Sequence, residues 1–417
     1  NRLAAVDAFY TLVNAQGGFP IQDGTDLIFF YVARAQYDVE DDQRDATEDF
    51  DAARRAAPVS VAGDFNAFVP GQDILTDEGL GVFHGRFTFT GAPGDRWRYK
   101  FVAKDAQNTD VWFSDPASRR NDYADPGRIS SVRGGALQGH IEQHVLGSAT
   151  LPARPIYIYL PPNYEGGTAP LPLLIAHDGN NLFDTAQPRS APGSWDLDGV
   201  IERELALGSI RPFIVAGIAN TNDRLDEYTH VTDDRGTGVI GGNGDAYADF
   251  VVQDVLPLIA NNYRTSTSAS DRGVLGSSLG GLNYYHIADR HPTQIGFVAG
   301  LSSTFSWGSI GLSNPTMQQR LDSDPNLAAR GHVYYLDSGG GPGAGCPAGS
   351  SDNYCSTVDM RDMLVRRTIL PFPDNPDVFP LTPANIRIMH WWEANAPHNE
   401  AAWNARVHRA LRLFARP

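Results

Sequence analysis

The spacing of apolar and polar residues changes along this chain of 417 residues, and each pattern predicts a different structure. From residue 58 to about residue 120, short alternating runs such as VSVAGDF, GVFHGRFTF and RWRYKFVA are separated by Gly, Pro and Asp. Alternation with period two is typical of half-buried β-strands, and regularly spaced turns are typical of a β-sandwich. This part of the chain therefore predicts a small all-β domain.

Farther along, the strand-like runs are apolar throughout and alternate with helical segments at 196–208 and 248–263. Strands that are buried on both faces need no polar side, so this pattern predicts a mainly parallel sheet covered by helices, an α/β domain. The predicted strands are residues 155–164, 170–179, 211–220, 272–278, 332–340 and 385–392.

The stretch 121–140, NDYADPGRISSVRGGALQGH, is rich in Gly, Ser and Asp and separates the two patterns. We therefore predict an N-terminal sandwich domain over residues 1–135 and an α/β domain over residues 136–417, in keeping with a chain too long for one typical domain. Residues 1–57 are less informative. Within them, 26–35 looks like a strand, and the charged stretch 39–56 is typical of a solvated insertion.

The segment 273–292, GVLGSSLGGLNYYHIADRHP, contains the first candidate for catalysis. Centred on Ser278 it reads G-x-S-x-G, with Gly276 and Gly280 two residues on either side. A sharp turn from a strand into a helix crowds these two positions, where glycine fits most easily. A flexible Gly/Ser turn would explain the composition but not the position between an apolar strand and a predicted helix. Ser278 is therefore the predicted nucleophile.

A serine hydroxyl needs a histidine base that is oriented by a carboxylate, and in the α/β-hydrolase fold the acid and then the histidine follow the serine. This order removes the histidines up to His291 from consideration. His332 comes before any suitable acid loop, His390 lies inside a predicted strand, and His408 lies on the C-terminal helix. His398, in the loop after the last strand, is the predicted base.

The acid is expected in the loop after the strand HVYYLD. Asp337 ends that strand, Asp352 lies between the two cysteines, and Asp359 and Asp362 begin the next helix. We favour Asp352, because a disulfide around its loop would hold the carboxylate toward the imidazole. Asp337 remains the alternative, although it can simply satisfy backbone amides at the strand end.

Ester hydrolysis also needs hydrogen-bond donors for the oxyanion of the tetrahedral intermediate. We expect one donor to be the backbone N–H of Leu279, the residue after the nucleophile. The other is expected in the loop AHDGNNLF after an early strand, at Asn180.

The two cysteines, Cys346 and Cys355, lie in one Gly-rich loop, which predicts a disulfide rather than two free thiols. A disulfide in turn predicts a secreted or periplasmic protein. Two sulfurs with no neighbouring histidine, and no H-E-x-x-H motif in the sequence, give no indication of a metal site. We expect no cofactor.

The formal net charge of −16 excludes nucleic acid as an expected partner, because a nucleic-acid-binding protein needs a basic face. No apolar run approaches the roughly 18 residues of a membrane span.

The rear part of the chain, from about residue 140, resembles the putative esterase family, which includes esterase D, enterochelin esterases and bacterial feruloyl esterases. The similar segments occur in order along the domain: YIYLPPNY, LLIAHDGNN, FIVAGIANTNDRLDEYT, ADFVVQDVLPLIANNYRTS, GSSLGG and HNEAAW. The resemblance implies an α/β-hydrolase fold with Ser278 and His398 in the site, and Asp352 in SSDNY is similar to the family's acid. The Gly- and Cys-rich insertion before Asp352 departs from the family pattern.

The front part resembles early-set, immunoglobulin-like modules related to glycogen- and starch-binding domains, on the segments VSVAGDFNAF, RYKFVAKD and VWFSDPASRRN. This resemblance implies an immunoglobulin-like sandwich with the capacity to contact glycan through exposed aromatic side chains. Trp97 and Trp112 lie in predicted strands, where packing in the core is the simpler role.

These features predict a serine carboxylic ester hydrolase that forms an acyl-enzyme intermediate. The expected substrates are feruloyl, acetyl or other small aryl or alkyl esters, free or linked to polysaccharide, and the candidates to line the pocket are Trp195, Trp391 and Trp392. One alternative is an enterochelin-type siderophore trilactone esterase, which calls for basic residues such as Arg224, Arg366 and Arg367. Another is an acyltransferase of the mycolyltransferase type. The sequence does not predict the oligomeric state.

Overall fold

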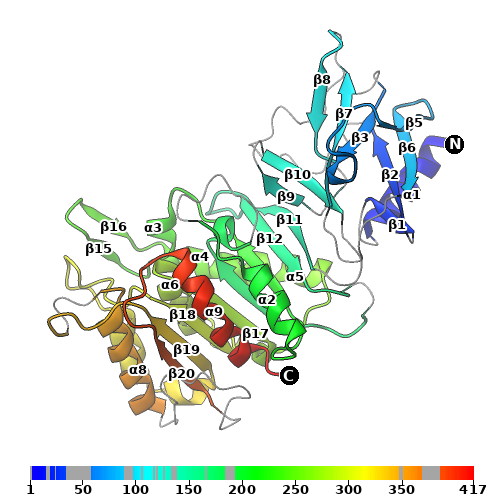
Figure 1. Cartoon of the computed structure of the whole chain (residues 1–417). Helices are drawn as coiled ribbons and strands as arrows, with labels where there is room; N and C mark the ends of the chain where they lie inside the picture. The colour runs from blue at the N-terminus through cyan, green and yellow to red at the C-terminus, as the bar shows by residue number, and fades with distance from the viewer. Residues whose placement is uncertain are drawn as a thin grey trace. The chain divides into compact units, whose positions relative to one another are not determined.

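The computed structural model describes residues 2–15, 19–23, 25–33, 58–88, 97–104, 107–115, 118, 121–124, 127–132, 139–164, 167–183, 193–346, 351–368 and 386–417. The chain divides into two compact units, the first made mainly of residues up to Val145 and the second mainly of those from Leu146 onward (Figure 1). The predicted insertion 39–56 lies outside the described residues. Among those residues, no helix combines the length and the apolar character needed to cross a membrane.

The first unit is a sandwich of two antiparallel sheets, preceded by helix α1 (Arg2–Ala15). One sheet has the strand order β1-β2-β6-β5, and the other has the order β4-β3-β7-β10-β9, with β8 paired to β7. Side chains from both sheets, including Phe29, Phe83 and Phe101, form one buried core. The strands are β1 (Ile21–Asp23), β2 (Asp26–Val32), β3 (Ser60–Gly63), β4 (Asp73–Ile74), β5 (Thr76–Asp77), β6 (Val82–Thr88), β7 (Trp97–Lys104), β8 (Asp110–Phe113), β9 (Asn121–Ala124) and β10 (Gly127–Val132).

The alternating pattern thus predicted an all-β unit correctly, while its immunoglobulin-like topology stays a prediction. Helix α1 was not predicted. The stretch 121–140 is more than a boundary, because β9 and β10 pair with each other and β10 pairs with β7. Backbone pairing of this kind needs no run of apolar side chains, so a Gly- and Ser-rich composition concealed it. Trp97 packs edge-on against Phe65 beside the core, at 6.2 Å between ring centroids.

The main sheet has eight strands in the order β11-β12-β14-β13-β17-β18-β19-β20, and the second unit contains those from Arg154 onward. β12 is antiparallel to β14. The strands that come after β14 in this sheet order, which are β13, β17, β18, β19 and β20, run parallel to β14 and to one another. This is the mainly parallel sheet of the α/β-hydrolase fold. The strands are β11 (His140–Leu146), β12 (Arg154–Leu160), β13 (Leu173–His177), β14 (Ile214–Ile218), β17 (Arg272–Ser277), β18 (Phe297–Leu301), β19 (Val333–Ser338) and β20 (Ile388–Trp392).

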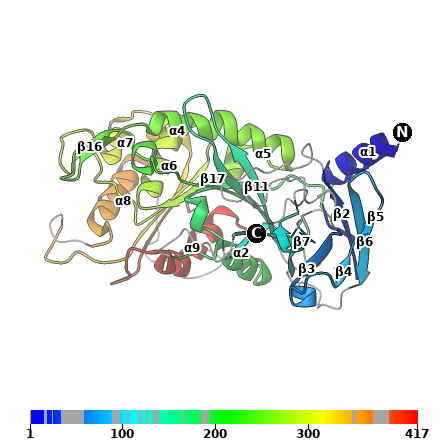
Figure 2. The same cartoon turned by 90° about the horizontal axis from the view of Figure 1, so that it is seen from above.

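Helices cover both faces of this sheet. Figure 2 shows α4, α5 and α6 on one side and α2 and α9 on the other, and strand residues between them are fully buried. A separate hairpin of β15 (Thr232–Asp234) and β16 (Val239–Gly241) follows α3. The helices are α2 (Leu197–Ala206), α3 (Arg224–Glu227), α4 (Gly244–Phe250), α5 (Leu256–Asn262), α6 (Leu279–Arg290), α7 (Met317–Ser323), α8 (Tyr354–Thr368) and α9 (Glu400–Phe414), with a π-helical turn, Val251–Val255, between α4 and α5.

The strand order sets where a ligand can bind. From β13 the chain first adds β14 on one side and later adds β17 on the other side. At such a reversal the loops after neighbouring parallel strands diverge and leave a crevice at their carboxyl ends. The loops after β13, β17, β19 and β20 all leave this edge of the sheet, and they carry Asn180, Ser278, Asp352 and His398.

Candidate active site

Ser278 occupies the turn between β17 and α6, in a strained backbone conformation. Its φ of 54° and ψ of −122° are unusual for a residue with a side chain. A Cβ atom added to Gly276 would lie 2.7 Å from the carbonyl carbon of Gly280, so the crossing of the two segments requires glycine there. The helix α6 begins at Leu279, directly after the serine, and the turn is the one that the G-x-S-x-G spacing predicted.

His398 and Asp352 are joined by a hydrogen bond of 2.5 Å between Nδ1 and Oδ1. The carboxylate is buried, with 3% of its side chain exposed, and its other oxygen accepts from the Ser302 hydroxyl at 2.7 Å and from the Gly339 backbone N–H. An ionised carboxylate only accepts hydrogen bonds, so Nδ1 carries the hydrogen and Nε2 keeps its lone pair. A neutral imidazole in this tautomer can accept a proton at Nε2.

Asp337, the alternative acid, lies in a different environment. It is fully buried and accepts from Arg406 at 3.1 Å and from the Tyr335 hydroxyl at 2.9 Å, and among the described residues no hydrogen bond or ion pair joins it to His398. Arg406 also lies 3.9 Å from Asp352. The structure therefore brings Asp352, and not Asp337, to the histidine.

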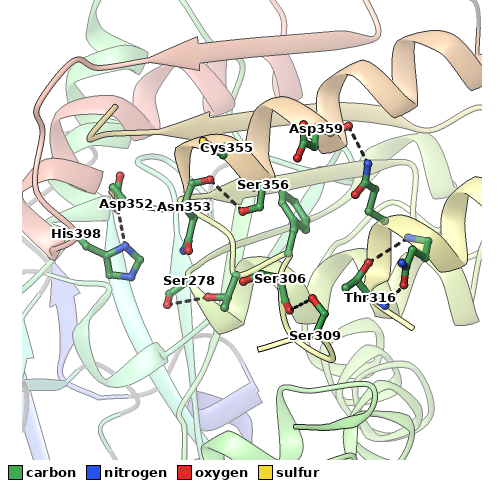
Figure 3. A pocket seen from close by; sticks show the side chains of 14 residues that line it. Ser278, Ser306, Ser309, Thr316, Asp352, Asn353, Cys355, Ser356, Asp359 and His398 are labelled. Atoms are coloured by element: carbon green, nitrogen blue, oxygen red, sulfur yellow. Dashed lines mark hydrogen bonds and ion pairs between the residues drawn. The ribbon is translucent and has the colours of Figure 1, made fainter. Parts of the chain in front are cut away.

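The Ser278 hydroxyl points toward Thr304, with 3.4 Å between Oγ and Oγ1 (Figure 3). Of the described residues, Thr304 supplies the hydrogen-bond partner of this hydroxyl. Ser278 and His398 nevertheless line the same two cavities. Thr304 could not be predicted from the sequence, because the loop after β18 comes close to the elbow only in the folded chain.

Asn180 and Leu279 both stand at the start of a helical segment. Leu279 is the first residue of α6, and Asn180 lies in a short 3₁₀ turn, Gly179–Asn181. Neither segment uses the N–H groups of Leu279 and Asn180 in its own hydrogen bonds, so these N–H groups are available to an anion. The Asn180 side chain is engaged with Asn220, accepting from its backbone N–H at 2.9 Å.

The turn before Asn180 is held by a charged network that the sequence did not predict. Asp178 has a φ of 55° and receives two hydrogen bonds from Arg224, at 2.6 and 2.8 Å, and one from Asn220 at 2.5 Å. Burial opposes ionisation of Asp178, but the charge of Arg224 together with the hydrogen bonds from Arg224 and Asn220 outweighs burial and holds the pKa of this carboxyl below its usual range. Arg224 itself lies on α3, which a buried ion pair between Glu227 and Arg154 fixes to β12.

Two cavities meet at Ser278 and His398. The smaller cavity, about 360 Å³, is lined by Asp178, Asn180, Asn181, Asn220, Arg224, Ser277, Glu400 and Trp403 in addition to those two residues. The larger cavity, about 580 Å³, extends between α8, the N-terminus of α7 and the loop after β18 (Figure 3). The described part of the chain contains no cluster of three or more His, Cys, Asp or Glu side chains suited to a metal ion.

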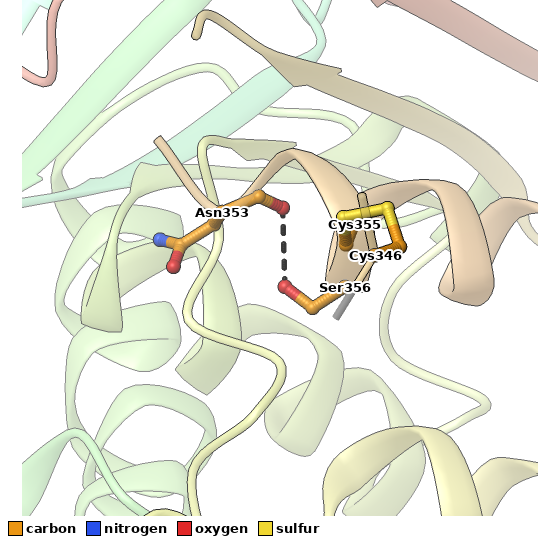
Figure 4. Close-up of a disulfide and its surroundings, with 4 residues drawn as sticks. All are labelled: Cys346, Asn353, Cys355 and Ser356. Atoms are coloured by element: carbon orange, nitrogen blue, oxygen red, sulfur yellow. Dashed lines mark hydrogen bonds between the residues drawn. A yellow bond between two sulfur atoms is a disulfide. The ribbon is translucent and has the colours of Figure 1, made fainter. Parts of the chain in front are cut away.

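Cys346 and Cys355 form the predicted disulfide (Figure 4). Cys355 lies in the first turn of α8, three residues after Asp352, and it lines the larger cavity. The cross-link therefore anchors the segment that carries the carboxylate next to His398.

The tryptophans that were candidates for the pocket lie elsewhere. Trp195 is buried against Trp403, Trp391 stacks under Arg409 at 3.4 Å, and the Trp392 ring nitrogen donates to a backbone oxygen. None of the three is among the described lining residues of either cavity. Each lies where an apolar ring packs well, which a sequence does not distinguish from a binding surface.

The basic residues that were candidates for binding an enterochelin-type substrate already have partners within the protein. Arg224 pairs with Asp178 at the rim of the smaller cavity, Arg366 pairs with Asp322 at 2.9 Å, and Arg367 donates to a backbone oxygen. Arg366 and Arg367 are not among the residues that line the two cavities in the described chain.

Comparison with known families decides the classification. The family model described as "Putative esterase" matches residues 148–413. The chain belongs to this esterase family. It is therefore an esterase-family hydrolase with the α/β-hydrolase fold, and the matched range contains every residue of the site described above.

Individual relatives of this esterase are distant. The uncharacterized protein YbbA of Bacillus subtilis (strain 168) is 27% identical over 173 residues, which are 40% of this chain, and the chain spans 62% of the length of YbbA. The fold is similar to a ferulic acid esterase, with 17% identity, a TM-score of 0.48 and coverage of 67% of this chain and 98% of that chain. It is also similar to the enterobactin esterase FES from Shigella flexneri, with 14% identity, a TM-score of 0.49 and 96% of each chain covered.

Proposed function

We propose that this esterase is a serine carboxylic ester hydrolase in which Ser278, His398 and Asp352 act as nucleophile, base and acid. The observation that supports it most directly is the 2.5 Å hydrogen bond from His398 to a buried carboxylate, in a cavity shared with a serine in a strained elbow. Each group has the environment that its role needs, since the imidazole is oriented and the serine is exposed to the cavity.

The reaction proceeds through an acyl-enzyme. Rotation about the Cα–Cβ bond of Ser278 carries Oγ from Thr304 toward Nε2 of His398, which takes the hydroxyl proton as Oγ attacks the ester carbonyl carbon. The imidazolium, stabilised by Asp352, then gives this proton to the departing alcohol. A water molecule attacks the acyl-serine by the same route, releasing the carboxylic acid and restoring Ser278.

The negative charge that develops on the carbonyl oxygen needs fixed donors. We assign this role to the backbone N–H groups of Leu279 and Asn180, because both lie in the first turn of a helical segment beside the nucleophile. The ion pair of Asp178 with Arg224 holds the turn before Asn180, so these donors are in place before the substrate arrives.

Small uncharged acyl groups, of the acetyl type, fit this site better than the alternatives. A feruloyl group calls for an apolar slot, whereas the apolar side chains among the described lining residues, such as Phe305 and Trp403, are buried. An enterochelin-type trilactone calls for available cations, and Arg224 is engaged with Asp178. Acyl transfer of the mycolyltransferase type calls for a dry acceptor groove, and the larger cavity is mainly polar.

The test compares the wild-type protein with Ser278→Ala on p-nitrophenyl acetate, methyl ferulate and enterobactin. We expect turnover of the acetate ester, and a loss of about 10⁴-fold or more in kcat in the variant without loss of folding. Retained turnover in Ser278→Ala would refute the assignment. Added alcohol separates hydrolysis from transfer, because an acyltransferase would form the new ester in place of acetate.

Two further predictions concern the compartment of the protein and a second ligand. The disulfide supports secretion to an oxidising compartment, because such bonds are rare where thiols are kept reduced. Glycan contact through the first unit stays a prediction, since Trp97 packs beside the sandwich core.

A further inference from the structure

The larger cavity differs from an ordinary small-molecule pocket in its chemistry. Ligand pockets are commonly apolar with a few polar groups. Here, beyond the catalytic residues, the lining is formed mainly by hydroxyl, amide and carboxylate side chains; they are Thr304, Ser306, Ser309, Thr316, Gln318, Gln319, Asn353, Ser356 and Asp359. Its two less polar members, Phe305 and Cys355, are almost fully buried.

Two side chains of this lining stand out. The Asp359 carboxylate is exposed to the cavity, and no hydrogen-bond or ion-pair partner is assigned to it within the described chain. Gln319 accepts from the backbone N–H of Thr316 through its Oε1, which leaves its NH₂ group as a donor. Gln319 lies on α7 and Asp359 on α8, two helices that pack together. A donor and an acceptor therefore face the same space.

We propose that the larger cavity is a subsite for a neutral, polyhydroxylated part of the ester, such as a sugar ring, with Asp359 and Gln319 as specificity-determining residues. This proposal rests on the proposed function. A sugar hydroxyl both donates and accepts hydrogen bonds, which matches a lining of mixed donors and acceptors. An apolar or aryl group would remove water from the same side chains without replacing its hydrogen bonds.

The side chains that line the cavity favour a neutral ligand over a charged one. No Lys or Arg is among the lining residues in the described chain, so an anionic group would find no counter-charge. A quaternary ammonium group is usually held by several aromatic faces, and Phe305, the one Phe, Tyr or Trp among the described lining residues, is buried. A neutral polyol can hydrogen-bond to these side chains, the Asp359 carboxylate included, without bringing a further charge into the cavity.

The experiment uses acetate esters of three alcohols, so that the acyl group and the acyl-enzyme are the same: a monoacetylated methyl xyloside, cyclohexyl acetate and acetylcholine. The measured quantity is the ratio of kcat/KM for the sugar acetate to that for cyclohexyl acetate. Comparing this ratio between wild type and variants cancels the intrinsic reactivity of the two leaving groups. We expect Asp359→Ala to lower it about tenfold or more, because hydrogen bonds to a charged group are lost.

Asp362→Ala is the matched control, since Asp362 lies three residues farther along α8 with 61% of its side chain exposed, outside the cavity lining. We expect it to keep the wild-type ratio. An unchanged ratio in Asp359→Ala, or faster turnover of acetylcholine than of the sugar acetate, would overturn the subsite. Ser278→Ala is assayed beside them. If it retains acetate hydrolysis, the proposed function fails; if it loses hydrolysis while Asp359→Ala keeps the ratio, only the subsite fails.

Discussion

Two buried aspartates, Asp352 and Asp337, lie close to the same arginine, and they have separable roles. Asp352 contacts His398 on one side and is 3.9 Å from Arg406 on the other, whereas Asp337 pairs with Arg406 at 3.1 Å. The first can orient the imidazole. The second neutralises a fully buried guanidinium.

We expect Asp352→Asn to lower kcat about 10³- to 10⁴-fold, because the amide no longer holds the His398 tautomer or stabilises the imidazolium. The free energy of unfolding of this variant should stay close to that of the wild type. The measurement is the steady-state hydrolysis of p-nitrophenyl acetate together with urea denaturation.

Asp337→Asn is the matched control for this prediction. It leaves the buried Arg406 with only the more distant carboxylate of Asp352, 3.9 Å away, so the free energy of unfolding should fall by about 3–5 kcal/mol while kcat stays within about tenfold of wild type. A larger loss of kcat in Asp337→Asn than in Asp352→Asn would reverse the assignment of the acid.

The sequence could identify residues that belong to a short motif or that follow one another in a known order along the chain. Ser278 was predicted because Gly276 and Gly280 lie two residues away, and His398 was predicted by chain order. The partners of these residues could not be found in this way. Thr304, Ser302 and Arg406 reach the site from other strands and helices, and their side chains are common in both cores and surfaces.

At the scale of elements, the period-two and buried-strand patterns predicted the sandwich and most strands of the large sheet. Strand β18 was missed because its five residues, FVAGL, are all buried between β17 and β19. A run this short, without alternation, resembles a loop as much as a strand. The hydrogen bonds around Asp233 could not be predicted either, since all its backbone donors but the adjacent Asp234 lie more than 70 residues farther along the chain.

Asp233, on the β15–β16 hairpin, holds the loop after β18 that contributes to the larger cavity. Its buried carboxylate accepts the backbone N–H groups of Gly308, Ile310, Gly311, Leu312 and the neighbouring Asp234 at 2.6 to 3.0 Å. Burial alone would raise its pKa, but these hydrogen bonds outweigh burial and lower the pKa of Asp233 to about 2. Because the folded-state pKa is depressed, this stabilisation is present above about pH 4 and is lost as the pH falls toward 2.

We expect Asp233→Asn to lower the free energy of unfolding by about 1–3 kcal/mol at pH 7, because the amide cannot accept all five N–H groups. The difference from wild type should shrink as the pH is lowered from 4 toward 2. Urea denaturation across this range measures it, with Asp234→Asn as the neighbouring control, whose carboxylate accepts N–H groups of its own turn. A difference that is constant with pH would contradict the role of the ionised carboxylate.

At the scale of the whole molecule, the residues assigned to catalysis and to the subsite lie between Asp178 and Trp403, within the range 148–413 that matches the esterase family. The two compact units have separate cores. The predicted division of the chain into a sandwich domain and a catalytic domain therefore makes a direct claim about what the second part can do alone.

We expect a chain covering residues 139–417 to fold and to hydrolyse p-nitrophenyl acetate with a kcat/KM within about threefold of the full chain, because it keeps every strand of the large sheet and every proposed catalytic group.

A chain starting at residue 155 is the informative comparison. It loses β11 and also Arg154, whose buried partner Glu227 then has no counter-charge, and its free energy of unfolding should be lower by about 3–5 kcal/mol. If the 139–417 chain folds, by circular dichroism, but is inactive, the first unit contributes to catalysis and the division fails. If both fragments are equally stable, the Arg154–Glu227 pair does not anchor α3 as its burial indicates.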